Sequence, residues 1–161
     1  MRTAVLALIA LTAACKPVVD AEAGEKSIKK WLSEQLGIEA DEVTCPQDVA
    51  RKNGKWFKCT ATAEGGELTI RVTQTNDDGN TRFGTSDIEG VVVSARLEDQ
   101  IEQAFRDRAN MEVTVDCGRR HRVAVPDATF HCEVENRKGE EAPIAVRVED
   151  RAGNVFWKLD R

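Results

Sequence analysis

The sequence predicts an α+β fold of two tandem, related modules, residues 25–90 and 91–161. Each module is expected to be one amphipathic helix packed on a three- to four-stranded antiparallel sheet with one internal disulfide. Three observations predict this fold. A pair of cysteines recurs after about 72 residues, a segment with helical periodicity precedes each pair, and segments that alternate apolar and polar residues accompany it.

Residues 1–15 predict a lipoprotein signal peptide that ends at Cys15. One charge, Arg2, precedes an eleven-residue apolar run, which is shorter than the roughly 20 residues of a transmembrane helix. Two alanines stand directly before Cys15, as in the bacterial lipoprotein signal that this segment resembles. Such a signal is cut before the cysteine, whose thiol then carries lipid. A plain secretory signal is the alternative, because Thr12 stands where the strongest lipoprotein pattern has leucine.

Residues 16–24 are expected to form a tether with a reach of at most about 30 Å. Residues 25–37 then predict a helix, because their apolar side chains recur at helical spacing and Gly37 is a natural stop. The apolar stripe contains Ile28, Trp31, Leu32 and Leu36.

After this helix the apolar period changes to two. Alternation over residues 57–63 and 68–72 predicts two strands, and the two glycines within residues 64–67 indicate a hairpin between them. The pair Asp78-Gly79 marks the next turn. The first module therefore predicts an antiparallel meander under its helix.

The second module repeats this order. A helical stripe precedes its cysteines, and alternating segments follow. The stripe contains Leu97, Ile101, Ala104 and Phe105, and the alternating segments lie near residues 130–134, 144–148 and 155–159. The segment VVVS, residues 91–94, is expected to pair as a strand and to bring the modules into contact.

Four of the five cysteines predict disulfides. Cys45 and Cys59 are 14 positions apart, and Cys117 and Cys132 are 15 apart; all four share the apolar phase of their strands. A module of about 65 residues buries little core, while closing such a loop contributes roughly 3 kcal/mol. We therefore expect the bonds Cys45–Cys59 and Cys117–Cys132, with Cys15 left for lipid.

The first module, roughly residues 25–87, resembles a family of bacterial lipoprotein domains known as domain of unknown function 4333. The likeness lies in a helix that ends at Gly37, in VTCPQDV and NGKWFKCTAT around the two cysteines, and in a glycine-containing hairpin into LTIRV. Family members are often anchored through a lipidated cysteine, and the family has no assigned activity. The resemblance therefore implies fold and location only.

Composition and charge indicate a globular protein that does not bind nucleic acid. Hydrophobic residues make up 41% of the chain and charged residues 32%. Without residues 1–15, 22 basic and 28 acidic residues remain, a net charge of −6. Such a charge opposes binding to a phosphate backbone.

The residues that could carry chemistry do not form a convincing set. Cys117, His121, His131 and Cys132 could be written as a zinc site, but His131 and Cys132 are neighbours on a strand and should face opposite sides. The chain has two histidines, and it contains no G-x-S-x-G motif or phosphate-binding glycine loop. The sequence predicts neither an enzyme nor a metal or cofactor site.

Two basic loops and one tryptophan are the candidate contact residues. Arg119, Arg120 and Arg122 lie in the loop of the second module, and Arg51, Lys52 and Lys55 lie in the matching loop of the first. We expect them to form one patch that faces an anion, and the alternative is a pair of ordinary solvated loops. Trp56 should point outward beside Lys55, whereas Trp31 and Trp157 should lie in the core.

The predicted function is that of a membrane-anchored lipoprotein of the bacterial cell envelope, which acts as a non-catalytic binding or structural module. Its partners would be the membrane, through the anchor, and an envelope protein, polymer or lipid. The alternative is an inhibitor of a secreted enzyme, because small disulfide-linked domains with exposed loops suit that use.

Overall fold

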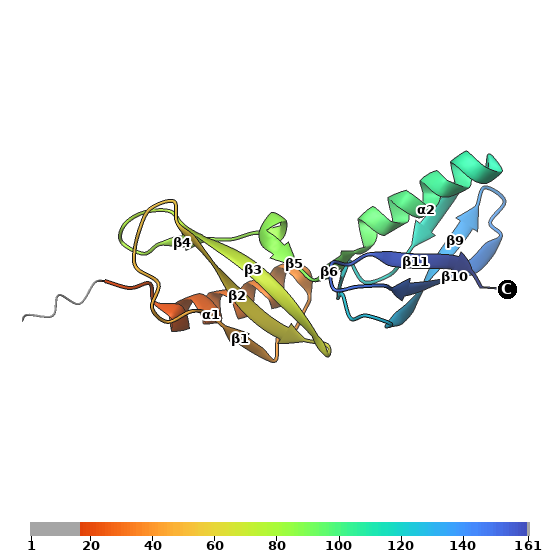
Figure 1. Ribbon diagram of the computed structural model, residues 1–161. Coiled ribbons are helices and arrows are strands. Elements are labelled where there is room, and N and C mark those ends of the chain that lie inside the picture. The colour runs from red at the N-terminus through yellow and green to blue at the C-terminus, as the bar shows by residue number, and fades with distance from the viewer. Residues whose placement is uncertain (1–16, 161) are drawn as a thin grey trace, which may run out of the picture.

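The computed structural model describes residues 17–160. The predicted signal peptide, with Cys15, lies outside these residues. Figure 1 shows two groups of strands, each beside one long helix, which follow one another along the length of the molecule. The predicted α+β class is confirmed by the helices α1 and α2 and by antiparallel sheets.

The first helix, α1 (Ala21–Trp31), continues into a π-helical turn, η1 (Leu32–Leu36). Asp20 caps its start, because a side-chain oxygen accepts a hydrogen bond from the Ala23 N–H at 2.9 Å. Gly37 ends the turn with φ of 65°, a left-handed conformation that glycine adopts without strain. The helix thus ends where the sequence predicts and begins four residues earlier.

The predicted tether is wrong from Pro17 onward. Val18 forms a β-bridge with Ala50, and the Val19 N–H donates to the Val49 carbonyl at 2.8 Å. Val19 is buried, and the Arg51 N–H donates to the Pro17 carbonyl at 3.1 Å. Burial of an apolar side chain and these backbone bonds hold residues 17–19 against the fold.

The sheet of the N-terminal half has the order β1-β2-β3-β4, and β5 also pairs with β3. Its elements are β1 (Glu42–Thr44), β2 (Trp56–Ala63), β3 (Gly66–Gln74), β4 (Thr81–Arg82), a 3-10 turn η2 (Thr85–Asp87) and β5 (Ile88–Glu89). The predicted hairpin joins β2 to β3 through Glu64 and Gly65, both at positive φ.

One face of this sheet packs against the helix. Ile28 and Leu32 are fully buried against inward-facing residues of β2 and β3, among them Cys59, Leu68 and Ile70. The side chains that alternate with these point away from the helix. Trp31 is half-buried and meets Phe83 edge to face, with ring centroids 5.4 Å apart.

The C-terminal half begins at β6 and has the sheet order β11-β10-β9-β7, with β6 and β8 as a separate pair. Its elements are β6 (Val91–Val93), α2 (Ser94–Ala109), β7 (Val113–Asp116), β8 (His121–Val123), β9 (Thr129–Asn136), β10 (Glu141–Val148) and β11 (Val155–Leu159). Leu97 and Ile101 of α2 pack on this sheet in a second hydrophobic cluster, and Phe105 stacks on Trp157.

Two disulfides link buried cysteines, which confirms the prediction of disulfide bonds. Cys45 bonds to Cys59 and Cys117 bonds to Cys132, and all four side chains are at most 4% exposed. Each bond ties the segment after a helix to the second strand of the adjoining sheet.

The two halves contact each other where the β2–β3 turn meets the segment around β8. A Cβ added at Gly66 would lie 2.6 Å from Val123 Cγ1 and 2.9 Å from Val125 Cγ2, so glycine leaves room there for two side chains of the C-terminal half. Gly90, just before β6, has φ of 91°, and its carbonyl accepts the Ala124 N–H at 2.8 Å. Side-chain packing at Gly66 and this backbone bond join the two halves.

Within residues 17–160, neither helix is both long and apolar enough to cross a membrane.

Candidate functional site

The predicted single basic patch is wrong, because the two basic loops lie at opposite ends of the β2–β3 hairpin. The loop of Arg119 contacts the turn at Glu64, whereas the loop of Arg51 and Lys55 precedes Trp56 at the start of β2. From Trp56 to Ala63 the strand is about 24 Å long, at roughly 3.4 Å per residue. Spacing along the sequence could not show this, because the hairpin separates the two loops in space.

Arg122 is a structural residue of the junction. Its guanidinium donates to the Ser94 hydroxyl at 2.9 Å, to the Arg119 carbonyl at 2.8 Å and to the Cys117 carbonyl at 2.5 Å. It also lies over the Phe130 ring, 4.3 Å from the centroid. Burial and the nearby charge of Arg119 lower the pKa of the Arg122 guanidinium, which stays charged because arginine titrates far above neutral pH.

Arg119 is also engaged within the protein. Its guanidinium pairs with the Glu64 carboxylate and donates to the Gly37 carbonyl, so it joins the two halves. Arg120 remains exposed, and its carbonyl accepts the Ser94 N–H at 3.0 Å. Of the three predicted contact residues in this loop, two therefore stabilise the fold.

We expect an Arg122→Ala variant to lower the free energy of unfolding by about 2 kcal/mol, because it removes three hydrogen bonds from a charged donor. Arg122→Lys should recover only part of this loss, since an ammonium cannot reproduce the planar fork. Urea denaturation checks both values, with Arg120→Ala as the matched control at less than about 0.5 kcal/mol. Equal stability of Arg122→Ala and wild type would contradict a structural role.

The other basic loop forms a surface that we call the basic end: Arg51, Lys52, Lys55, Trp56 and Arg82. Gln74 organises it, although its side chain is 1% exposed. The Gln74 side chain accepts the Lys52 N–H at 2.8 Å and donates to the Ala50 carbonyl at 3.2 Å. Gln74 was not predicted as a site residue. The one signal that could have revealed it is a glutamine on the apolar phase of a strand.

Trp56 is the exposed aromatic residue of the basic end, as predicted, with 55% of its surface accessible. The Arg71 guanidinium lies over its ring, 5.7 Å from the centroid. Trp56 pairs in register with Thr73, which in turn pairs with Arg82 of β4. Arg71 and Arg82 were missed as candidates, although the alternation along β3 had already placed Arg71 on the outward phase.

Acidic groups neutralise part of the neighbouring sheet face. Lys58 lies 3.7 Å from a Glu89 carboxylate oxygen, and Arg71 lies 3.9 Å from one of Asp87. Exposed pairs of this kind contribute little to stability and exchange readily with other anions. Lys52, Lys55 and Arg82 have no ion-pair partner among the residues that the structure describes.

The basic end lies where the folded chain begins. Val18 is bridged to Ala50, and the Arg51 Nε donates to the Val18 carbonyl at 2.8 Å. Val18 itself is 41% exposed, although it is apolar. The start of the basic loop, at Ala50 and Arg51, therefore lies against the first residues that the structure describes, and Trp56 follows on the outward face of β2 at the same end of the sheet.

The residues considered as zinc ligands are not arranged around one point. Cys117 and Cys132 are bonded to each other, so neither is a free thiolate. His131 is exposed on β9, and its Nε2 lies 3.5 Å from Asp160, while His121 lies on β8. Among residues 17–160, no group of three or more His, Cys, Asp or Glu side chains could hold a metal ion.

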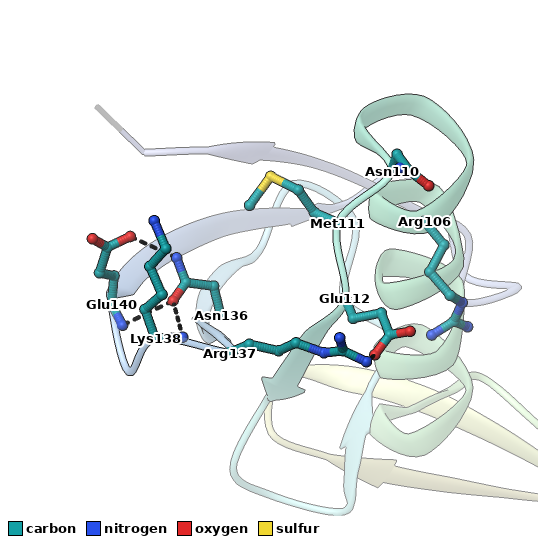
Figure 2. Close-up of a pocket in the computed structure, with 8 residues that line it drawn as sticks. All are labelled: Arg106, Asn110, Met111, Glu112, Asn136, Arg137, Lys138 and Glu140. Atoms are coloured by element: carbon teal, nitrogen blue, oxygen red, sulfur yellow. Dashed lines mark hydrogen bonds and ion pairs between the residues drawn. The ribbon is translucent and has the colours of Figure 1, made fainter.

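A cleft of about 680 Å³ lies between the end of α2 and the β9–β10 turn (Figure 2). Its polar side chains already bind one another. Arg137 pairs with Glu112, Asn136 donates to Glu140 at 2.7 Å, and Arg106 lies 3.6 Å from Glu102 outside the cleft. These contacts leave the cleft without a converging set of free polar groups.

Comparison with known proteins bears on the N-terminal half. The family model described as domain of unknown function (DUF4333) matches residues 3–79. This part of the chain is similar to DUF4333. No curated protein and no solved structure matches the chain.

The DUF4333 match agrees with the predicted resemblance and begins earlier in the chain. It includes α1, β1, β2 and β3, the Cys45–Cys59 disulfide and most of the basic end. It also includes Cys15 and stops before Arg82. The C-terminal half lies outside the matched range.

Proposed function

We propose that the protein is a lipoprotein of the bacterial cell envelope, anchored by lipid on Cys15, that works as a non-catalytic binding module through its basic end. The observation that carries this proposal is the position of the basic end. Ala50, at the start of the basic loop, is bridged to Val18, three residues after the cysteine, and the exposed Trp56 and the cations of Lys52, Lys55 and Arg82 lie at the same end of the sheet.

We also propose that the two halves are related modules with one disulfide each. The support is a shared register: Cys59 pairs with Ile70 in the first sheet, and Cys132 pairs with Ile144 in the second. In both halves, the cysteine after the helix bonds to this strand cysteine. Equivalent positions on equivalent strands would not be expected to coincide in unrelated folds.

The outward positions of the two modules have diverged. Counting from the strand cysteine, Trp56 and Lys58 of the first module correspond to Thr129 and His131 of the second. The residue after the strand cysteine is Thr60 in the first module and an acidic residue in the second. The combination of Trp56 and Lys58 is therefore specific to the first module, and the outward surface of the second differs, with Phe156, 51% exposed, paired in register with Arg147.

An anionic component of the envelope is the partner that this surface fits. Lysine and arginine form charge-assisted hydrogen bonds with carboxylates and phosphates, and tryptophan is enriched at contact surfaces. The cations lie on a loop held by a buried glutamine, so they are displayed at fixed positions. Binding of an anionic partner by such a surface needs no catalytic side chain.

Fractionation of cells of the native host tests the anchor. Wild-type protein is expected in the membrane fraction after washing at high salt, with fatty acid on its N-terminal peptide. Cys15→Ser should carry no fatty acid and should leave the membrane under the same wash. Fatty acid on the peptide of Cys15→Ser, or its absence from wild type, would contradict the proposal. Mass spectrometry of the peptide also identifies an uncut signal, which could otherwise hold the variant in the membrane.

A further inference from the structure

We infer that the basic end docks on anionic lipid headgroups of the same membrane that holds Cys15, with Trp56 at the headgroup level. This inference rests on the proposed lipid anchor and names the partner of the proposed binding surface. Three observations support it: the few residues between Cys15 and the basic end, the exposed apolar and aromatic side chains there, and the cations that lack an ion-pair partner among the described residues.

The distance between anchor and surface is short. Val18 is fixed to Ala50 by a β-bridge, and it is the third residue after Cys15. Even a fully extended chain spans about 10 Å over three residues. A lipid on Cys15 would therefore hold Val18 and the Arg51 guanidinium bonded to it within about one Debye length of the headgroups, and would bring the rest of the basic end toward the same surface.

The exposed side chains suit an interface between water and lipid. Trp56 is 55% exposed on the outward face of β2, and Val18 is 41% exposed beside Ala50 at the same end of the sheet. Tryptophan is enriched at membrane interfaces, where its ring sits among the headgroups and its N–H stays hydrated.

The charges of the basic end can reach the headgroups ahead of the acidic groups nearby. Asp20 and Asp77 accept backbone N–H groups at 2.9 and 2.8 Å, which holds their carboxylates against the protein. Asp48 and Asp78 are exposed but short. Lysine and arginine side chains extend several bonds farther, so the cations of Lys52, Lys55 and Arg82 lie outermost when the surface meets a membrane.

Lipid anchoring and a basic surface reinforce each other. One acyl chain alone gives marginal membrane binding, and stable anchoring takes a second signal such as another chain or a basic patch. Each cation near an anionic surface strengthens binding about fivefold. Docking would also fix the first module against the membrane and direct the second module, which follows it along the molecule, away from the anchor (Figure 1).

The position of Trp56 can be measured by fluorescence quenching. The acylated full chain, purified from its host, is placed in vesicles of phosphatidylcholine with or without phosphatidylglycerol, doped with a lipid that carries a nitroxide quencher at its headgroup. We expect quenching in the anionic vesicles that disappears in Trp56→Phe, since Trp31 and Trp157 are half-buried. High salt should weaken the quenching, because it screens the headgroup charge.

The contribution of the cations is measured without the lipid. In a full-length Cys15→Ser background, a Lys52→Ala/Lys55→Ala/Arg82→Ala variant should bind anionic vesicles roughly 100-fold more weakly, at about fivefold for each cation. The matched control removes three exposed cations of the C-terminal half, Lys138→Ala/Arg151→Ala/Lys158→Ala, and should leave binding unchanged. Circular dichroism confirms that each variant is folded.

The outcomes separate this inference from the proposed anchor. Wild-type protein without lipid on Cys15 would overturn the anchor and the inference with it. Acylated protein in which Trp56 escapes the headgroup quencher, or equal vesicle binding by the two triple variants, would overturn the docking alone. Equal binding of the Cys15→Ser chain, which carries no lipid, to neutral and anionic vesicles would also overturn it.

Discussion

A Cys59→Ala variant is expected to lose about 3 kcal/mol of unfolding free energy. The Cys45–Cys59 bond closes a loop with a sequence separation of 14, and removing that restraint gives the unfolded chain more conformations. Cys59 is 0% exposed, so the change also leaves a small void among the side chains between α1 and the sheet. Urea denaturation measured by circular dichroism gives the value.

Two matched variants sharpen this prediction. Cys132→Ala opens a loop with a separation of 15 and should cost a similar amount, because Cys132 is equally buried. Cys15→Ser should leave the unfolding free energy unchanged, since neither disulfide uses Cys15. A loss of less than about 1 kcal/mol in either disulfide variant would show that burial alone, without the bonds, holds these sheets together.

An Ile28→Ala variant is expected to destabilise the N-terminal half by roughly 2–5 kcal/mol, the range for a buried large side chain cut to alanine. Ile28 is 0% exposed and joins α1 to the first sheet. Hydrogen exchange followed by mass spectrometry should show lost protection in β2 and β3. The strands of the second sheet should keep theirs, because their core is a separate hydrophobic cluster.

Ile101→Ala is the matched counterpart. Ile101 is also 0% exposed and packs on the second sheet, so lost protection should move to β9 and β10. Ile28→Val removes one methyl group and should cost about 1 kcal/mol. Loss of protection across both sheets in each alanine variant would contradict two cores that unfold separately.

Local patterns were sufficient to predict most of the fold. The apolar stripe of Ile28, Leu32 and Leu36 identified the first helix, because side chains three and four positions apart share one face of a helix. Alternation identified β2 and β3 for the corresponding reason in a strand, and it placed Cys59 inward. Such patterns involve neighbours in the chain, so they can be read without knowing the rest of the structure.

Features that depend on contacts distant in sequence were not predicted. The bridge from Val18 to Ala50 and the bonds of Gln74 to the basic loop need the sheet register before they can be seen. The earlier start of α1 could have been read, because Asp20 followed by alanine and glutamate is a good helix start.

The candidate site shows the same limit. Arg51, Lys52, Lys55 and Trp56 were predicted contact residues, and the structure places their loop against Val18 through Ala50 and Arg51. They were grouped with Arg119 and Arg122 because the loops occupy matching positions in the two predicted modules. A matching position says nothing about proximity, since the distance between two such loops is set by the way the halves join.

Intact mass spectrometry of the protein made by its own host tests the sulfur chemistry on which the proposed anchor and the fold both depend. We expect a chain that begins at Cys15, carries acyl groups on that residue and is four hydrogens lighter than its reduced form, because two disulfides remain. A chain with an unmodified Cys15 would contradict the proposed lipid anchor, and freely alkylated thiols at Cys45, Cys59, Cys117 or Cys132 would contradict the disulfide-closed fold.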